Sequence, residues 1–309
     1  MSLRLRLFRP FLKWVVKPHL ARTPTPQKAR AEFEWSARLT FRRVPFTIQL
    51  EETVSLQDRS LRLVWVSAGA VRNDTVLLYL HGGGYIVGSP ETHGAMMAHL
   101  SKLAGTRVVM PDYRLAPEHA FPAQLDDALA AWQALLDKGY APENIMIGGD
   151  SAGGGLALSL LAELCQRGQH PAACVCFSPW TDLTLSGKSL QDNARSDLLL
   201  SVERINELRD YFLHSSAPDN PRASPLLANF PNCPPVFMQY STTEILADDA
   251  RRMATALETQ GAQVTLDPWT DLPHVWHIFQ GALPEADQAL AKTAQFMRAH
   301  FPAPPPAGN

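Results

Sequence analysis

Gly149-Asp150-Ser151-Ala152-Gly153-Gly154 is the stretch that decides the fold. A short apolar run at 145–148 precedes it, and a leucine-rich run with helical spacing at 156–164 follows it. A G-x-S-x-G sequence between a strand and a helix marks a sharp turn that exposes the serine hydroxyl. We therefore expect Ser151 in a strained backbone conformation, with Gly149 and Gly153 beside it because a Cβ there would crowd the neighbouring backbone.

Strands and helices alternate around this turn. The run at 76–80 is continuously apolar, as expected for a strand that is covered on both faces. The alternation predicts an α/β fold, with a mostly parallel eight-stranded sheet flanked by helices. The expected strands are 46–50, 61–66, 76–80, 107–110, 145–147, 174–177, 236–239 and 264–266, and the expected helices are 123–138, 251–260 and 286–301.

Three segments fall outside this alternation. Residues 7–17 predict an amphipathic helix with one apolar face, which Pro18 ends. Thr25-Pro26 predicts an N-cap and first helical residue, opening a second helix toward Trp35. The polar segment 180–225, with a helix at 202–213, is expected as an insertion beyond the sheet, and the proline-rich end 302–309 as disordered.

The composition is that of an ordinary globular chain, with 309 residues of which 46% are hydrophobic and 19% are charged. The net charge of −2 argues against a general nucleic-acid-binding protein. The charge is unevenly distributed, because residues 1–31 hold eight basic residues and no acidic one, which leaves −10 on the remainder. We expect this basic segment to dock on the acidic body of the protein, with contact to anionic lipid as the alternative.

The sequence gives no sign of a membrane span or a metal site. No stretch reaches the roughly 18–20 apolar residues of a transmembrane helix, and the weakly signal-like start lacks a cleavage site. We expect a cytoplasmic protein with no obligatory membrane contact. The four cysteines show no metal-ligand spacing and are expected as apolar core residues in a reducing compartment, with Cys174 and Cys176 on one face of a strand.

A serine hydroxyl becomes a good nucleophile only when a base takes its proton, so Ser151 needs a histidine and an acid that orients it. In an α/β-hydrolase these residues follow in the order Ser, Asp or Glu, His. His274 lies in a loop after the last expected strand, where the base would stand over the carboxyl edge of the sheet. His277 is the alternative base, although a residue about one helical turn after His274 is more easily explained as packing in the core or facing solvent.

The acid is expected after the strand 236–239. Glu244 lies five residues past this strand, on the loop, and is the favoured candidate. Asp248 is the alternative, although Asp248 and Asp249 are also explained as carboxylates that favour the N-terminal end of the next helix.

His81-Gly82-Gly83-Gly84-Tyr85 follows the central strand directly. Glycines let the main chain approach a substrate, and backbone amides in such a turn can stabilise the oxyanion of a tetrahedral intermediate. The turn has no G-x-x-x-x-G-K-[ST] or G-x-G-x-x-G pattern, so phosphate binding is disfavoured. An HGGG turn followed by a G-x-S-x-G motif is much more specific than either motif alone.

In these motifs the chain resembles the hormone-sensitive-lipase-like esterases, bacterial family IV of the lipolytic enzymes, over about residues 45–300. The motifs are His81-Gly82-Gly83-Gly84, Asp112-Tyr113-Arg114-Leu115-Ala116-Pro117-Glu118-His119, Phe121-Pro122-Ala123, the turn around Ser151, Ser178-Pro179-Trp180-Thr181-Asp182 and Pro273-His274-Val275. The resemblance implies an α/β-hydrolase core at 46–182 and 226–301, with a helical cap built from 1–45 and 183–225. It also implies hydrolysis of short- to medium-chain acyl esters without a cofactor.

The resemblance also implies roles for single residues. Ser151 would be the nucleophile and His274 the base, and the acid position, usually Asp in the family, aligns with Glu244. The implied oxyanion donors are Gly83, Gly84 and Ala152. Tyr85 and Trp180 would lie at the substrate pocket, Asp112 and Arg114 would pair near its floor, Glu118 would support the HGGG turn, and an edge strand would form a homodimer.

Two other functions are compatible with the same fold. Amide hydrolysis of the arylacetamide type would use the same three residues. A non-catalytic small-ligand receptor, as in the plant gibberellin receptors that resemble this family, would have lost the catalytic histidine, and the presence of His274 argues against it.

Overall fold

Eight strands form one sheet in the computed structural model, which describes residues 1–22 and 25–303. The sheet order is β1-β2-β4-β3-β5-β6-β7-β8; β2 is antiparallel to both of its neighbours and the other pairs are parallel. All eight predicted strands and the α/β class are confirmed. The strands are β1 (Thr47–Ser55), β2 (Ser60–Ala68), β3 (Arg72–Leu80), β4 (Thr106–Pro111), β5 (Ile145–Asp150), β6 (Cys174–Phe177), β7 (Val236–Ser241) and β8 (Val264–Trp269).

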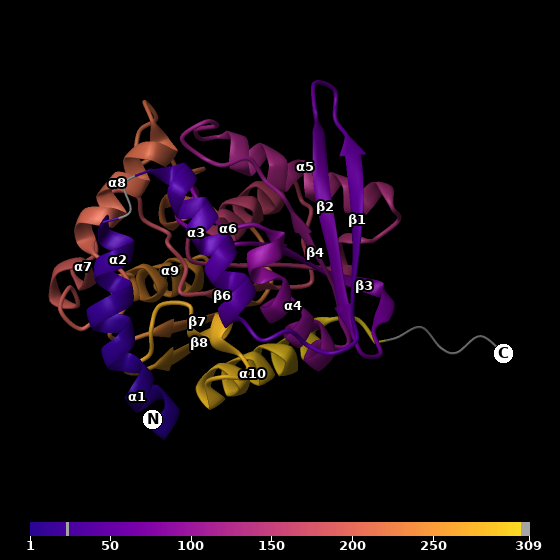
Figure 1. Ribbon diagram of the computed structural model, residues 1–309. Helices are drawn as coiled ribbons and strands as arrows, with labels where there is room; N and C mark the ends of the chain where they lie inside the picture. The colour runs from indigo at the N-terminus through magenta and orange to yellow at the C-terminus, as the bar shows by residue number, and fades with distance from the viewer. Residues whose placement is uncertain (23–24, 304–309) are drawn as a thin grey trace.

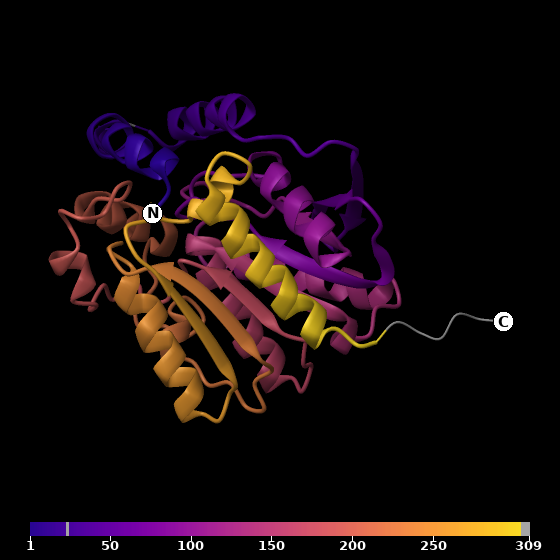
Figure 2. The same ribbon diagram turned by 90° about the horizontal axis from the view of Figure 1, so that it is seen from below.

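Helices cover both faces of this sheet (Figures 1 and 2). The side chains of a covered strand alternate between the two faces. Thus Leu78 and Leu80 of β3 join the cluster under α5, α6 and α9, whereas Leu77 and Tyr79 join the cluster under α4 and α10. The helices that cover the sheet are α4 (Pro90–Ala104), α5 (Ala123–Asp137), α6 (Ser151–Gln166), α9 (Ala247–Thr259) and α10 (Pro284–His300).

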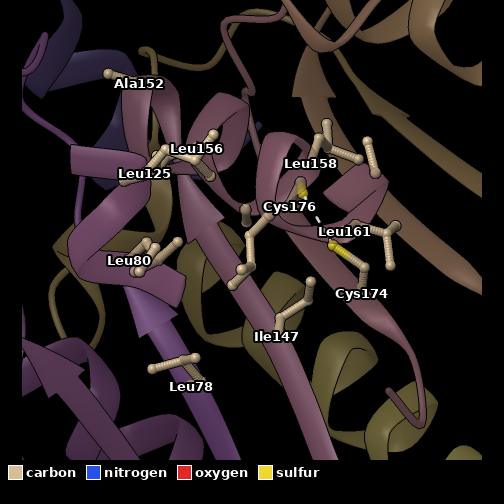
Figure 3. Packing of buried hydrophobic residues seen from close by; sticks show 14 of the residues in the cluster. Leu78, Leu80, Leu125, Ile147, Ala152, Leu156, Leu158, Leu161, Cys174 and Cys176 are labelled. Atoms are coloured by element: carbon tan, nitrogen blue, oxygen red, sulfur yellow. Dashed lines mark hydrogen bonds between the residues drawn. The ribbon is translucent and has the colours of Figure 1, made fainter. Parts of the chain in front are cut away.

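The central part of the core packs α6 against the middle strands. Figure 3 shows Leu156 of this helix beside Leu125 of α5, and Leu161 beside the Cys174 and Cys176 side chains of β6. The two sulfur atoms are 3.6 Å apart and belong to free thiols. This confirms that both cysteines point to one face of their strand.

Two groups of helices lie at the carboxyl edge of the sheet. The N-terminal group lies beside the insertion in Figure 1, and Lys17 Nζ donates to the carbonyls of Ala194 and Asp197 at 2.9 Å each. The N-terminal group is α1 (Leu3–Phe11), the π-helical turn η1 (Leu12–Val16), α2 (Lys17–Arg22) and α3 (Pro26–Thr40), and the insertion holds α7 (Ser189–Asp192) and α8 (Val202–Leu213). The short 3-10 helices are η2 (Pro142–Asn144), η3 (Pro225–Leu227) and η4 (Trp276–Phe279). None of the helices in the described part of the chain is long and apolar enough to span a bilayer.

The prediction that Pro18 ends the first helix is wrong. The helical run continues without a break through residues 3–22, and the wider turn η1, closed by the Lys17 N–H bonding to the Leu12 carbonyl, directly precedes Pro18. Irregular turns of this kind and prolines are common together at sites where a helix bends without ending. Thr25 does cap α3 as predicted, accepting from the Lys28 amide, and the last residues of the expected disordered end, 304–309, lie outside the described residues.

The turn between β5 and α6 brings backbones into very close contact. Ser151 has φ of 54°, a strained value for a residue with a Cβ. A Cβ on Gly153 would lie 2.1 Å from the Leu80 carbonyl oxygen, and one on Gly149 would lie 2.2 Å from the Gly153 oxygen. The predicted role of these glycines is confirmed.

We expect Gly153→Ala to lower the free energy of unfolding by about 2 kcal/mol or more, because rigid backbone atoms occupy the space of the added methyl group. Gly94→Ala is the matched control, since Gly94 is also helical and nothing lies within 4 Å of its Cβ position. That control should be neutral or stabilising by up to about 1 kcal/mol. Urea unfolding followed by circular dichroism measures both, and equal stability of the two variants would contradict the argument.

Candidate active site

Ser151, His274 and Glu244 form a hydrogen-bonded chain. The His274 Nε2 atom is 2.8 Å from the Ser151 Oγ atom, and its Nδ1 atom is 2.8 Å from the Glu244 Oε2 atom. Ser151 begins α6 directly after β5, Glu244 follows β7, and His274 follows β8. The three hydrogen-bonded side chains therefore come from the carboxyl ends of three strands. Glu244 and His274 are buried, whereas Ser151 is only partly buried. The structure thus brings together the three residues predicted from motif order.

The buried carboxylate sets the proton affinity of the histidine. Burial lowers the pKa of His274, but the hydrogen bond and charge of Glu244, with the charges of Asp197 and Asp150, outweigh it and raise this pKa above its ordinary value. Burial likewise raises the pKa of Glu244, against the opposing effect of His274. The histidine is therefore prepared to accept a proton from Ser151 and to hold it beside a negative charge.

The loop that carries Glu244 is held by the insertion. The Asp197 carboxylate accepts from the Ile245 amide at 2.8 Å, next to the acid. The Asn193 side chain donates to the Glu244 carbonyl at 2.8 Å, and the Ser196 hydroxyl donates to the Thr243 carbonyl at 3.0 Å. These bonds fix the backbone on both sides of Glu244.

The HGGG turn lies against the serine turn. The Asp150 carboxylate, which is buried, accepts from the Gly82 amide at 3.0 Å and from the Tyr79 hydroxyl at 2.8 Å. The Tyr113 hydroxyl donates to the His81 carbonyl at 2.7 Å. These contacts orient the turn from behind.

Three backbone amides remain for a ligand. The amides of Gly83, Gly84 and Ala152 donate to no other residue in the part of the chain that the structure describes. Gly83 has φ of 123° and Gly84 φ of 60°, values that favour glycine. Free amides beside a serine hydroxyl can bind the oxygen of a polarised carbonyl.

The alternative base and acids have other partners. His277 is buried, its Nε2 atom is 2.9 Å from Gln239 Oε1, and burial lowers its pKa to about 3. It therefore packs as a neutral ring. Asp248 accepts from the Ser189 amide, and Asp249 accepts from the Thr181 and Asp182 amides, so neither carboxylate reaches His274.

Two expected contacts are wrong. Asp112 and Arg114 do not pair with each other, because Arg62 binds Asp112 at 3.0 Å and the buried Asp127 binds Arg114 at 2.9 Å. Arg62 belongs to β2 and Asp127 to α5, so Asp112 and Arg114 each bind a different element of the core.

Glu118 does not contact the HGGG turn. It binds Arg30 at 3.0 Å, and Arg30 Nε donates to the carbonyl of Ile86, which follows the turn. Its support is therefore indirect.

The expected pocket residues Tyr85 and Trp180 are each 1% exposed. The Tyr85 ring stacks on Phe212 of α8 with centroids 3.7 Å apart. Their part in substrate binding stays a prediction.

The sequence profile of the α/β-hydrolase fold family matches residues 77–278. An acetyl-hydrolase of Streptomyces hygroscopicus is 38% identical over 76% of this chain and 78% of its own, and an esterase of Acinetobacter venetianus is 35% identical over 78% and 82%. The crystal structure of an esterase from the bacterial hormone-sensitive lipase family superposes with a TM-score of 0.89 and 37% identity, covering 98% of this chain and 99% of that one.

The chain belongs to the hormone-sensitive-lipase-like esterases. It is a carboxylic ester hydrolase, and small-molecule esters are its substrates. The fold class and family that the motifs predicted are both confirmed.

Sequence reasoning missed the residues that support the esterase's acid loop. Asp197, Asn193 and Ser196 lie about fifty residues before the loop that they hold, in a segment expected only as an insertion. The Asp150 network was also missed, although Asp150 lies within the quoted motif. Their contacts in three dimensions identify them, and of these polar groups Asp197 and Asp150 are also buried.

Asp197→Asn tests the support of the acid loop in the esterase. We expect kcat to fall by between about tenfold and 100-fold, because small displacements of catalytic groups are costly. The charge of Asp197 raises the pKa of His274, so its loss should move the acidic limb of the kcat/KM profile to lower pH. The exposed Asp192, in the same insertion, provides the control Asp192→Asn. An acidic limb that stays in place would contradict the role of Asp197.

Proposed function

We propose that the chain is a serine esterase that works through an acyl-enzyme, with Ser151 as nucleophile, His274 as base and Glu244 as the orienting acid. The single observation that carries the proposal is the chain of two 2.8 Å contacts from Ser151 Oγ through the His274 ring to Glu244. Nucleophile and base within hydrogen-bond reach, with the base oriented by a third group, is the arrangement that activates a serine.

In the first half-reaction Ser151 Oγ attacks the ester carbonyl while His274 Nε2 takes the hydroxyl proton. The amides of Gly83, Gly84 and Ala152 stabilise the negative charge on the carbonyl oxygen. Glu244 stabilises the imidazolium, which then gives its proton to the leaving alcohol. Water, activated by His274 in turn, releases the acid and restores the serine.

We infer a short- to medium-chain acyl preference, at the short end of that range. Leu208 of α8 packs over the oxyanion turn, since its Cδ1 atom is 2.6 Å from the Cβ position of Gly84. Phe212 on the same helix stacks on Tyr85. Relatives named an acetyl-hydrolase and an ethyl acetate hydrolase, at 38% and 32% identity, support a small acyl group.

The division of the chain belongs to the same proposal. Residues 1–45 and 183–225 would form the cap over the core at 46–182 and 226–301, supported by the bonds of Lys17 to the insertion. A homodimer through an edge strand, β1 or β8, and a cytoplasmic location stay predictions.

Ser151→Ala should lower hydrolysis of p-nitrophenyl acetate by at least about 10³-fold, with the circular dichroism spectrum and melting temperature unchanged. A fluorophosphonate should label the unaltered protein and not this variant. Glu244→Gln should also lose activity strongly, because Glu244 contacts the histidine. Asp248→Asn should stay near the unaltered rate, because the Asp248 carboxylate binds the Ser189 amide instead. Unchanged turnover by Ser151→Ala would refute the proposal, and faster turnover of p-nitroacetanilide than of the acetate would favour an amidase.

Leu208→Ala should enlarge the acyl site and raise the kcat/KM ratio of the hexanoate to the acetate ester by about tenfold, the range expected for added methylenes in a hydrophobic pocket. Leu103→Ala is the control, because Leu103 is a half-buried leucine on α4, under the opposite face of the sheet. The same change of ratio in both variants would exclude α8 as the boundary of the acyl site.

A further inference from the structure

The first helical segment is apolar on two sides. Its inner side packs on the segment that carries His274, because Leu5 and Phe8 join a cluster with Leu272, Trp276 and Leu283. The Phe8 ring also lies edge-on to Phe279, with centroids 5.1 Å apart. This contact uses only two of the nine apolar residues in residues 3–16.

The outer side carries a second set of apolar residues at helical spacing. Leu3 is 70% exposed, Leu7 72% and Trp14 73%, and Phe11 and Val15 are more than half exposed. We call these five residues the outer stripe. Figure 2 shows α1 at the outer margin of the molecule, beside the insertion. A contiguous exposed apolar patch normally marks an interaction site. The apolar face predicted from the sequence is therefore only partly covered, since the structure divides it between core and surface.

Positive charge surrounds the outer stripe. Residues 1–31 hold eight basic residues and no acidic one. Arg6, Arg9 and Lys13 line a depression of about 300 Å³ next to Trp14. Arg9 pairs with Asp271 at 3.0 Å. The exposed Arg6 and the half-buried Lys13 are the cations of this depression for which no acidic partner is found among the described residues.

We propose that the outer stripe docks on the surface of an anionic phospholipid bilayer. Leucine and aromatic side chains flanked by basic residues are the composition of a helix that lies in a membrane interface. Anionic lipid attracts each nearby Lys or Arg. The rest of the chain has a net charge of −10 and is repelled by the same lipid, so the basic segment would face the bilayer. A second copy of the chain is a poorer partner, because a two-fold contact through the stripe would bring two basic segments face to face.

The geometry places the site close to this surface. The inner side of the same helix packs on the loop that bears His274, and Lys17 bonds to the insertion that holds the Glu244 loop. An enzyme docked in this way would meet esters that partition into the bilayer.

Co-sedimentation of the full chain with vesicles tests the proposal. We expect binding to vesicles of equal parts phosphatidylglycerol and phosphatidylcholine, weak or no binding to pure phosphatidylcholine, and weakening as salt is raised. Leu7→Glu should lower the affinity by about tenfold or more, since it removes an exposed leucine that would enter the bilayer and adds a charge that anionic lipid repels. Leu50→Glu is the matched control, an equally exposed leucine (65%) on β1, at the far edge of the sheet.

Hydrolysis of a soluble ester should be unchanged in both variants, which shows that they are folded and separates this test from that of the catalytic residues. The proposal is overturned if the unaltered protein does not bind anionic vesicles, or if Leu7→Glu and Leu50→Glu bind equally well. It is also overturned if light scattering shows that the unaltered protein is a dimer that Leu7→Glu alone converts to a monomer, because a second copy would then cover the stripe.

Discussion

The close approach of two backbones at the head of α6 is the constraint on which the site depends. Gly153 lies so near the Leu80 and His81 carbonyls that no Cβ fits between them. This contact fixes the end of β3 against the serine turn, and with it the HGGG turn that follows β3. The Asp150 carboxylate then holds the Gly82 amide from the same turn. Nucleophile and oxyanion donors are thus parts of one rigid assembly, and preorganised donors of this kind need no rearrangement during the reaction.

The base and acid depend on a second set of contacts. His274 and Glu244 stand on loops after β8 and β7, and the Thr242 amide donates to the Trp269 carbonyl at 2.6 Å where these two loops begin. Polar groups from the insertion hold the acid loop, and apolar residues of α1 pack on the histidine loop. The site therefore joins a rigid half built by the sheet to a half whose geometry is set by the helices above it. Substitutions in those helices should therefore alter proton transfer by His274 more than they alter the position of the oxyanion donors.

Signals that are local in the sequence predicted most of this structure. Apolar runs and apolar–polar alternation located every strand, and chain order together with loop position favoured the residues that meet at Ser151. The helix 90–104 went unpredicted, although Ser89 forms a capping box and Gly105 ends it in the left-handed region. Contacts between distant segments were the main failure. Arg114 binds Asp127 rather than Asp112, and Asp197 supports a loop almost fifty residues away, because a carboxylate's partner depends on which chains meet in space.

Helical periodicity fails at the N-terminus for a related reason. Spacing predicts a helix with an apolar face at residues 7–17, but it cannot say which of the apolar residues the body of the protein covers. Burial stabilises a fold by about 25 cal/mol per Å² of apolar surface, so Leu5 and Leu12, both 1% exposed, contribute to folding. Leu7 and Trp14 contribute almost nothing of this kind. Packing within the fold does not explain why these two residues are hydrophobic. A partner surface that covers them would explain it, and the basic residues around them require that surface to be negatively charged.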